Sequence, residues 1–521
     1  MNLYQTNFTQ VDSVIVVVYL LGSLVIGIWA NRYVGNLSDY LVAGRTLRIR
    51  LALASMTGTE FGLVTFMYMS ELGFLQQFAA LYLGVLEGVA VLTVGLTGFL
   101  VYRLRQTEVM TVPEYYQRRF SPGVRVVGGT MMVLSGVLNM GLFLKAGSQF
   151  ITAISGLQDE MYLKWIMTGL LLLVLFYTVL GGMVSVVITD LIQFFVLGVG
   201  MVVVTGFVVY NIGLDGFQHV VTQYAGCYDP TDSVNRSATL LPAATQQGIG
   251  YKTIFQMAAI IGSASLLWPP MASRTLAVQS SEVAQRLYRF SPIPLLARNV
   301  IPIIWGIAAY YYFATNDGFR EALSAALADE SVQTWSAMPL YLSKVIPTGC
   351  IGLVTAGMVA AFMSTHDSYL LCWSGVITQD ILGPLFGPFS QRTRILITRI
   401  GILAIGAVLL TWGLWYELSS NLWNYMAVTG TVYLAGALPV VAGGLYWKRA
   451  STAGAYFALL GGLTGLLAMD PSIAMLKKLG LTVSGADITL LAFAVSAGGF
   501  VAGSLLWPNR KATPGRDETT N

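Results

Sequence analysis

Charged residues are scarce in this sequence, and their scarcity limits what the protein can be. Lys, Arg, Asp and Glu make up 10% of the 521 residues, whereas hydrophobic residues make up 55% and the mean hydropathy is +0.68. A soluble domain needs far more charge to cover its surface. The composition therefore predicts an all-α, polytopic membrane protein in a lipid bilayer, with no nucleic-acid partner.

Cysteines and catalytic motifs are also few. Cys227, Cys350 and Cys372 have neither the number expected of a disulfide framework nor the spacing of a metal site. No segment resembles a hydrolase triad, a P-loop or a zinc motif, so we expect a protein that is not an enzyme. The polar N-terminus is followed by an apolar run of full spanning length, which favours a retained helix over a cleaved signal peptide.

Long apolar runs are what the chain has in abundance. At about 20 residues for each crossing, they predict about thirteen transmembrane helices. The predicted helices cover 11–30, 50–73, 77–102, 126–155, 163–181, 183–212, 251–273, 293–314, 342–378, 395–413, 420–446, 452–469 and 487–507. The ninth is too long for one crossing, so we expect its first part to be a separate surface segment.

Basic residues indicate how the chain crosses the membrane. Most of the 29 Lys and Arg residues, including Arg274 and Arg298, fall in loops or span ends that would lie on one side. Because cytoplasmic loops are enriched in basic residues, the N-terminus is predicted outside and the C-terminus inside a plasma membrane, such as a bacterial inner membrane. Neither of the long outer loops, 213–250 and 315–341, is expected to fold as a domain.

Two of the predicted helices are interrupted in comparable ways. The second contains the small and polar run 54–62, and the seventh contains 262–265 followed by Trp268, Pro269 and Pro270. The breaks are five helices apart, and since five is odd, the two five-helix sets would be inserted in opposite orientations, as in secondary transporters. The alternative is that Gly and Pro only kink these helices.

These features predict how the chain is divided. The predicted parts are an N-terminal flanking helix with an inner loop (1–49), a first repeat (50–212), an outer loop (213–250), a second repeat (251–446), two flanking helices (447–507) and a cytoplasmic tail (508–521).

The densest polar cluster inside an apolar run lies in the ninth predicted helix. Ala361, Ser364, Thr365 and Ser368 follow the i, i+3, i+4, i+7 spacing and share one helix face, with Asp367 beside them. Such oxygens are costly in hydrocarbon unless they face a partner or a cavity, so the cluster is a candidate ion site. Hydroxyls that only join neighbouring helices are the alternative.

Two motifs give the chain a resemblance to a known family. The segment Gly181–Gln193, with the sequence GGMVSVVITDLIQ, and the segment Met363–Leu371, with the sequence MSTHDSYLL, resemble the sodium:solute symporter family. This family includes sodium-coupled sugar, proline and sialic acid transporters. The resemblance implies two inverted five-helix repeats with broken first helices, one flanking span before them and two after.

The resemblance also implies a sodium site between the second and ninth helices. Its ligands would be the carbonyls of Leu53, Met56 and Ala361 and the hydroxyls of Ser364 and Thr365. Na+ is a hard cation that exchanges its water for several oxygens, and an unwound helix exposes carbonyls that can supply them.

A second cation position is implied by some members of the family. The matching residues here are Asp190, Ser364, Asp367 and Ser368, where Asp367 stands in place of a hydroxyl. The position would hold a second sodium or a proton. The alternative for Asp190 is an ion pair with an arginine of an inner loop.

The solute-binding residues are predicted near the two breaks. Glu60 and Glu87 are carboxyls at membrane depth, which would suit a cationic or hydroxyl-rich solute. A structural role, protonated or paired with Lys145, is the alternative. His366 and Tyr369 are expected to pack, and Arg274 to anchor the inner surface. The full set of residues predicted to bind the solute is Ser55, Thr57, Thr59, Glu60, Glu87, Ser263 and Ser265.

The function predicted from these features is Na+-driven symport of a small polar organic solute by alternating access. The nearest alternative is a proton-coupled symporter, in which one of the buried carboxyls titrates. A transporter-like membrane sensor is an alternative of another class, and a channel is favoured least.

Overall fold

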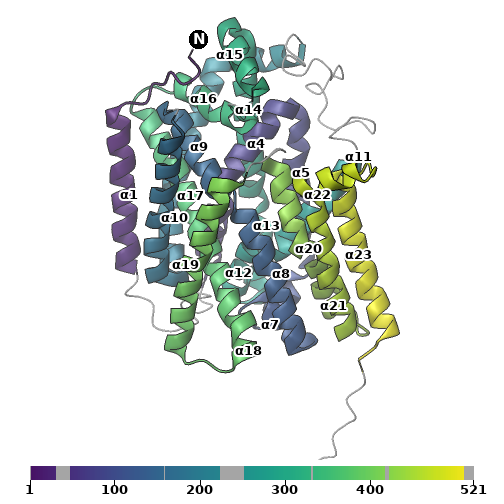
Figure 1. Ribbon diagram of the computed structural model, residues 1–521. Coiled ribbons are helices and arrows are strands. Elements are labelled where there is room, and N and C mark those ends of the chain that lie inside the picture. Colours follow the sequence, from purple (N-terminus) through teal and green to yellow (C-terminus); the bar gives the residue numbers. More distant parts are fainter. Residues whose placement is uncertain are drawn as a thin grey trace, which may run out of the picture.

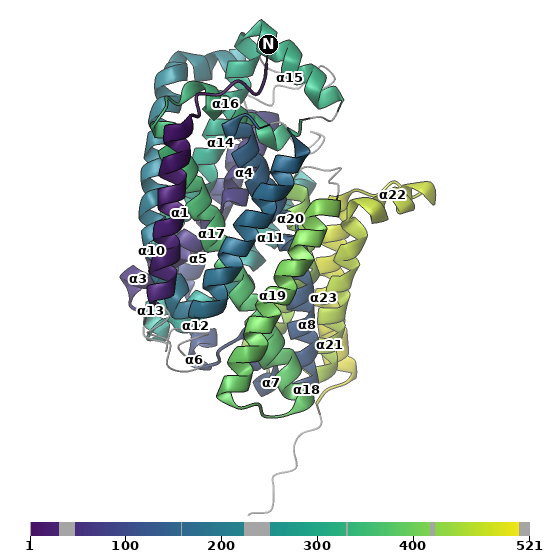
Figure 2. The same cartoon turned by 60° about the vertical axis from the view of Figure 1, so that its left-hand side comes forward.

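The computed structural model describes residues 2–30, 47–157, 159–222, 251–329, 332–416 and 422–509. Their regular structure is helical, apart from one isolated bridge between Leu47 and Val278. The long helices lie side by side in a single bundle, with α15 and α16 at one end of it (Figure 1, Figure 2). The all-α class predicted from composition is confirmed.

The first half of the chain begins with a lone apolar helix and continues with a broken one. Its elements are α1 (Gln10–Ala30), α3 (Ile49–Glu60), α4 (Leu63–Gln76), η3 (Gln77–Leu81), α5 (Tyr82–Thr97), α6 (Val101–Gln106), α7 (Val112–Arg119), α8 (Pro122–Met140), α9 (Phe143–Ser155) and α10 (Glu160–Thr222). Ordinary capping sets several ends: Ser121 accepts from the amide of Val124 at the start of α8, and Gly98 ends α5 with a φ of +69°.

The second half also begins with a broken helix. Its elements are α11 (Tyr251–Leu267), α12 (Pro269–Ala277), α13 (Ser281–Phe290), α14 (Pro292–Thr315), α15 (Asp317–Ala328), η4 (Thr334–Ser336), α16 (Ala337–Val345), α17 (Cys350–Val376), η5 (Ile377–Leu382), α18 (Gly383–Phe386), α19 (Gln391–Trp415), α20 (Leu422–Tyr446), α21 (Thr452–Gly461), η6 (Gly462–Ala468), α22 (Asp470–Lys478) and α23 (Gly485–Leu506). The separate segment expected before the ninth helix is α16, but most of its side chains are buried, so it is not the surface piece that was predicted.

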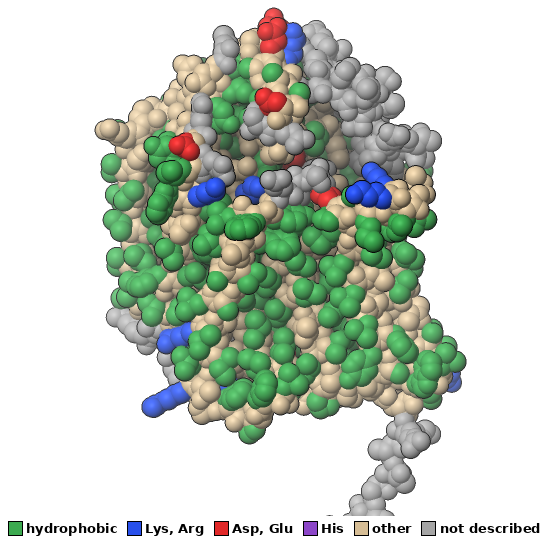
Figure 3. All heavy atoms as spheres, viewed as in Figure 1, with side chains coloured by type: hydrophobic (Ala, Val, Ile, Leu, Met, Phe, Trp, Pro, Cys, Tyr) green, Lys and Arg blue, Asp and Glu red, His purple; other side chains and the backbone are tan. Residues whose placement is uncertain are grey.

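An apolar surface surrounds the bundle. Ten helices of the described ranges are long and apolar enough to cross a membrane, or eleven if the bent pair 452–468 and 470–478 counts as one span. α10 alone contains two apolar stretches, Met161–Leu180 and Val186–Val220. Hydrophobic side chains cover the middle band of the face in Figure 3, and charged side chains lie toward its two ends. The chain is therefore a multi-pass membrane protein. The count of about thirteen spans stays a prediction, because the described residues contain ten or eleven candidates.

Both predicted interruptions are present, and each break lies in the last part of the stretch predicted for it. α3 continues to Glu60, and Gly62 takes an extended conformation before α4. α11 continues to Leu267, and the break lies at Trp268, directly before Pro269. Proline lacks the amide hydrogen that a helix interior needs but is tolerated in the first turn, so it ends one helix and begins the next.

A close crossing of α4 and α14 joins the two halves. A Cβ on Gly73 would collide with the carbonyl of Ile303, and a Cβ on Gly306 would collide with the carbonyl of Ser70. The two backbones can therefore approach only because both positions are glycine. This crossing holds the first part of α14, which carries Arg298, beside the broken helix α3–α4.

Candidate functional site

The break between α3 and α4 leaves carbonyls at the end of α3 without partners in their own helix. A helix that stops cannot satisfy its last carbonyls through the helical ladder. The amide of Phe61 donates to the carbonyl of Thr57 at 3.0 Å, which satisfies the first of them. The carbonyls that follow must accept from other helices.

Two hydroxyls of α17 donate to these carbonyls. Ser364 Oγ donates to the carbonyl of Gly58 at 2.9 Å, and Thr365 Oγ1 donates to that of Thr59 at 3.2 Å. Both hydroxyls also lie near the carbonyl of Ala361, at 3.3 and 3.0 Å. The predicted residues Ala361, Ser364 and Thr365 thus gather at the helix break with neutral oxygens of the kind that bind a hard monovalent cation.

The carbonyls predicted as ligands at Leu53 and Met56 lie within α3 and not at its end. In a continuous helix each carbonyl accepts from the amide four residues later, so these two carbonyls are expected to be engaged. The carbonyls that meet the α17 hydroxyls belong instead to Gly58 and Thr59. The carbonyls of Leu53 and Met56, which the family resemblance implied, therefore stay a prediction.

A buried arginine occupies the region predicted for a second cation. Arg274 of α12 is 1% exposed, and its Nη2 lies 3.2 Å from Oδ2 of Asp190, which is fully buried in α10. The same Nη2 donates to Thr59 Oγ1 and to Ser368 Oγ, each at 2.7 Å. The prediction that Arg274 anchors the inner surface is therefore wrong. Arg274 instead forms an ion pair with Asp190, which was the alternative considered for Asp190.

Asp367 is buried next to this arginine cluster but has a different partner. Its Oδ2 accepts from the hydroxyl of Tyr177 at 3.0 Å, and its Oδ1 has no hydrogen-bond partner among the described residues. Asp190 Oδ1 is likewise buried without a partner in that part of the chain. The structure thus brings Asp190, Asp367 and Ser368 into one region, as the sequence predicted.

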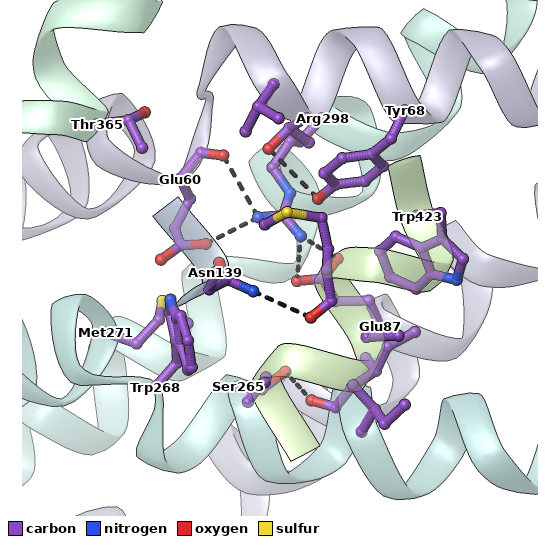
Figure 4. Close-up of a pocket in the computed structure, with 18 of the residues that line it drawn as sticks. Glu60, Tyr68, Glu87, Asn139, Ser265, Trp268, Met271, Arg298, Thr365 and Trp423 are labelled. Carbon is purple, nitrogen blue, oxygen red and sulfur yellow. Dashed lines mark hydrogen bonds and ion pairs between the residues drawn. The ribbon is translucent and has the colours of Figure 1, made fainter. Parts of the chain in front are cut away.

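A second buried arginine joins the two carboxyls of the solute prediction. Arg298 of α14 donates from Nη1 to Glu60 Oε2 at 2.8 Å and from Nη2 to both oxygens of Glu87 at 2.9 and 2.7 Å. It lies between the two glutamates in Figure 4. Lys145, the predicted partner, donates instead to the carbonyl of Tyr416. Arg298, which was predicted at an inner span end, lies near the start of α14 and is buried there.

These groups face a cavity of about 120 Å³ at the centre of the bundle. Carboxyls, one arginine and several aromatic rings surround it (Figure 4). Its lining residues include Thr59, Glu60, Tyr68, Glu87, Asn139, Ser265, Trp268, Arg298, Thr365, Tyr369 and Trp423. Tyr369, for which packing was predicted, also accepts from Trp268 Nε1 at 2.7 Å and so helps to fix an aromatic wall. A cavity with a few polar groups and aromatic walls is typical of a small-molecule site.

The remaining solute candidates divide into two groups. Those that line the cavity are Thr59, Glu60, Glu87 and Ser265, and those that do not are Ser55, Thr57 and Ser263. The hydroxyls of Ser263 and Ser265 donate to carbonyls four residues earlier in α11, as expected of serines inside a helix.

Sequence reasoning missed the roles of Arg274 and Arg298. Both stand close to the ends of predicted spans, where arginine usually marks the membrane surface. One signal could have corrected this: two carboxyls predicted at membrane depth require a cation, and an arginine several residues inside an apolar run can supply it.

Comparison with known proteins identifies relatives over most of the chain. The model of the sodium:solute symporter family matches residues 40–465. The sodium/glucose cotransporter of Vibrio parahaemolyticus is 24% identical over 92% of this chain and 87% of its own, and the sodium/proline symporter of Haemophilus influenzae is 25% identical over 87% and 86%. Among solved structures, a Na+-coupled sialic acid symporter in a substrate-bound, outward-open state matches with a TM-score of 0.76 at 17% identity, over 97% of this chain and 100% of that one. At this identity the structural match establishes the fold.

Proposed function

Since the chain belongs to the sodium:solute symporter family and is therefore a Na+-driven secondary transporter, we propose that it carries one small polar solute through its central cavity by alternating access. The membrane potential and the sodium gradient drive this transport, with about 2.3 kcal/mol for each charge at 100 mV. The protein works in a plasma membrane with its N-terminus outside and its C-terminus inside.

One observation carries the assignment of the sodium site. Ser364 and Thr365 of α17 meet the end carbonyls of α3 where that helix breaks. We assign Na+ to this junction, with Ala361, Ser364 and Thr365 as ligands and the carbonyl of Gly58 as the α3 ligand. The carbonyls of Leu53 and Met56, which the family resemblance implied, would serve only if α3 unwinds further when Na+ binds.

The ion site and the solute cavity share side chains. Thr59 and Thr365 line the cavity and also form one of the contacts at the helix break. Na+ that binds at the break would therefore fix the wall against which the solute lies. This arrangement couples the two ligands, because each favours the state in which the other binds.

The charge around the cavity limits the class of solute. Two carboxylates and one guanidinium leave a net negative charge, and Glu60 Oε1 is a buried acceptor with no partner among the described residues. A solute with an ammonium group or with several hydroxyl donors satisfies that oxygen, and the rings of Trp268 and Tyr369 suit a cation. An anionic solute would be repelled by the two glutamates.

Thermal stability of the purified protein tests this proposal. Melting temperatures are compared in NaCl, KCl and choline chloride at equal ionic strength, with glucosamine, glucose and gluconate as matched solutes. A ligand of the folded state raises the melting temperature by mass action. We expect Na+ to stabilise the protein and the amine or the neutral sugar to add to the effect. A melting temperature that does not depend on Na+ and changes instead over mildly acidic pH would overturn Na+ coupling. It would favour the proton-coupled alternative.

A further inference from the structure

Glu71 of α4 is a buried carboxyl group that neither the sodium site nor the solute cavity uses. The residue is 3% exposed and is absent from the cavity lining. Among the described residues, no lysine or arginine forms an ion pair with it. A buried carboxyl without a cation depends on hydrogen-bond donors, so its partners indicate what it holds in place.

Each oxygen of Glu71 has a donor from a different part of the chain. The hydroxyl of Thr334 in η4 donates to Oε1, and the backbone amide of Leu422, the first residue of α20, donates to Oε2 at 3.1 Å. The first amides of a helix have no partner within that helix, and a carboxylate suits its positive end. Glu71 therefore joins α4 to two elements that are 263 and 351 residues away in the chain.

Two aromatic rings lie between these contacts and the central cavity. Tyr68 precedes Glu71 by about one helical turn, and Trp423 directly follows Leu422. The two ring centroids are 5.0 Å apart, and both residues line the cavity (Figure 4). The cavity-lining part of α4 ends at Met69, so the ring pair closes the side of the cavity that faces η4.

The bond between Glu71 and Leu422 sets the separation of α4 and α20 at this side of the cavity. The rings of Tyr68 and Trp423 come one from each helix, so they stay in contact only while that separation is kept. η4 leads directly into α16, and the contact with Thr334 therefore also ties the α15–α16 end of the bundle to α4 (Figure 1).

We propose that Glu71 is a positioning residue for transport, because its carboxyl group fixes the ring pair Tyr68–Trp423 as the wall between the cavity and the α15–α16 end. Glu71, Thr334 and Leu422 together are called the Glu71 clasp below. A solute that enters from that end reaches the cavity only after the clasp releases α20. The inference rests on the proposed function, since it takes the cavity as the solute path and the α15–α16 end as the outer one.

Thiol labelling from outside tests this proposal. Ala264 of α11 lines the cavity, and Ala264→Cys places a thiol there in a parent protein without native cysteines (Cys227→Ser, Cys350→Ser and Cys372→Ser). Right-side-out vesicles in NaCl receive a membrane-impermeant, cationic methanethiosulfonate reagent, and the rate of labelling is measured. Glu71→Ala removes both acceptors of the clasp and should raise this rate by about tenfold or more, because two hydrogen bonds that hold the wall closed are lost.

Two variants test whether the hydrogen bonds of the clasp are responsible. Glu71→Gln can accept from the amide of Leu422 through its side-chain oxygen and donate to Thr334 through its side-chain nitrogen. Its labelling rate should therefore stay near that of the parent protein. Thr334→Val removes one of the two donors and should raise the rate by about threefold.

Asp12→Ala is the matched control for a loss of stability alone. Asp12 is a fully buried carboxyl at the start of α1, at the same end of the protein. Its Oδ1 accepts from the amides of Gly349 and Gly352 at 2.7 and 2.8 Å, so it also joins two distant elements through backbone amides. Its loss should lower the melting temperature and leave the labelling rate unchanged.

The outcomes separate this inference from the proposed function. Labelling that Glu71→Ala leaves unchanged, or that Asp12→Ala or Glu71→Gln accelerates equally, would overturn the clasp. If Glu71→Ala cannot be obtained, Thr334→Val decides: a faster rate supports the clasp and an unchanged rate rejects it. The melting temperature of the parent protein with and without Na+ is measured beside these rates. A parent that Na+ does not stabilise would overturn sodium coupling itself, whatever the labelling rates are.

Discussion

The hydroxyl of Thr365 donates to the carbonyl of Thr59 at 3.2 Å across the helix break, and both residues also line the central cavity. Thr365, a ligand of the proposed sodium site, is therefore also part of the cavity wall. This contact would connect the proposed sodium and solute sites directly, without any intermediate element.

Loss of either hydroxyl at the junction should weaken Na+ binding. Ser364→Ala or Thr365→Ala removes one oxygen ligand of a charged ion, an interaction of about 1.5–3 kcal/mol, and should raise the Na+ concentration for half-maximal effect by roughly 10–100-fold. The measurement is the melting temperature as a function of Na+ concentration.

Ser374→Ala is the matched control for this pair. Ser374 is a buried serine of the same helix, and its hydroxyl donates to the carbonyl of Leu370 within α17. Its loss should leave the Na+ dependence unchanged. An unaltered Na+ response in both junction variants would reject the site assignment.

Arg298 and Glu87 should behave as a coupled pair. Arg298→Gln leaves Glu60 and Glu87 buried without their cation, and breaking a buried pair typically costs about 3–5 kcal/mol of unfolding free energy. The double variant Arg298→Gln with Glu87→Gln removes one charge of each sign and should recover part of that loss. Melting temperatures of the two single variants and the double variant measure the coupling. Purely additive losses would contradict the pairing.

Asp190 and Asp367 should differ although both are buried in one region. Asp190→Asn removes the carboxylate that Arg274 contacts. The free energy of unfolding should therefore fall by about 3–5 kcal/mol. In Asp367→Asn the amide oxygen can still accept from Tyr177, so the expected loss is no more than about 1.5 kcal/mol. Unfolding of both proteins in Na+-free buffer compares them. Equal losses would show that Asp190 is not the principal partner of Arg274.

The glycine crossing of α4 and α14 should be sensitive to one methyl group. Gly306→Ala would push a Cβ into the carbonyl of Ser70, and overpacking of this kind costs about 1–3 kcal/mol. Gly169→Ala in α10 is the control, because a Cβ there meets nothing within 4 Å. The melting temperature should fall for the first variant only. Equal behaviour of the two would mean that α4 and α14 can separate without loss.

The sequence by itself determined the class of the protein and the chemistry of its centre. Low charge and long apolar runs are sufficient for a helical membrane protein, because each span must satisfy its own backbone in lipid. The helical spacing of Ser364, Thr365 and Ser368 placed their hydroxyls on one face, since that spacing is local geometry. The two motifs indicated the family that the comparisons then established.

Only the tertiary structure decided the partners of the charged groups. Arg298 lies 238 residues from Glu60, and Arg274 lies 84 residues from Asp190, so no local pattern links them. Their positions near span ends suggested surface arginines, and the close packing of α14 and α12 against α3 brought them inward instead. The last residue of α3 was also decided by packing, because hydroxyls of α17 and the guanidinium of Arg298 satisfy the carbonyls that the helix leaves free.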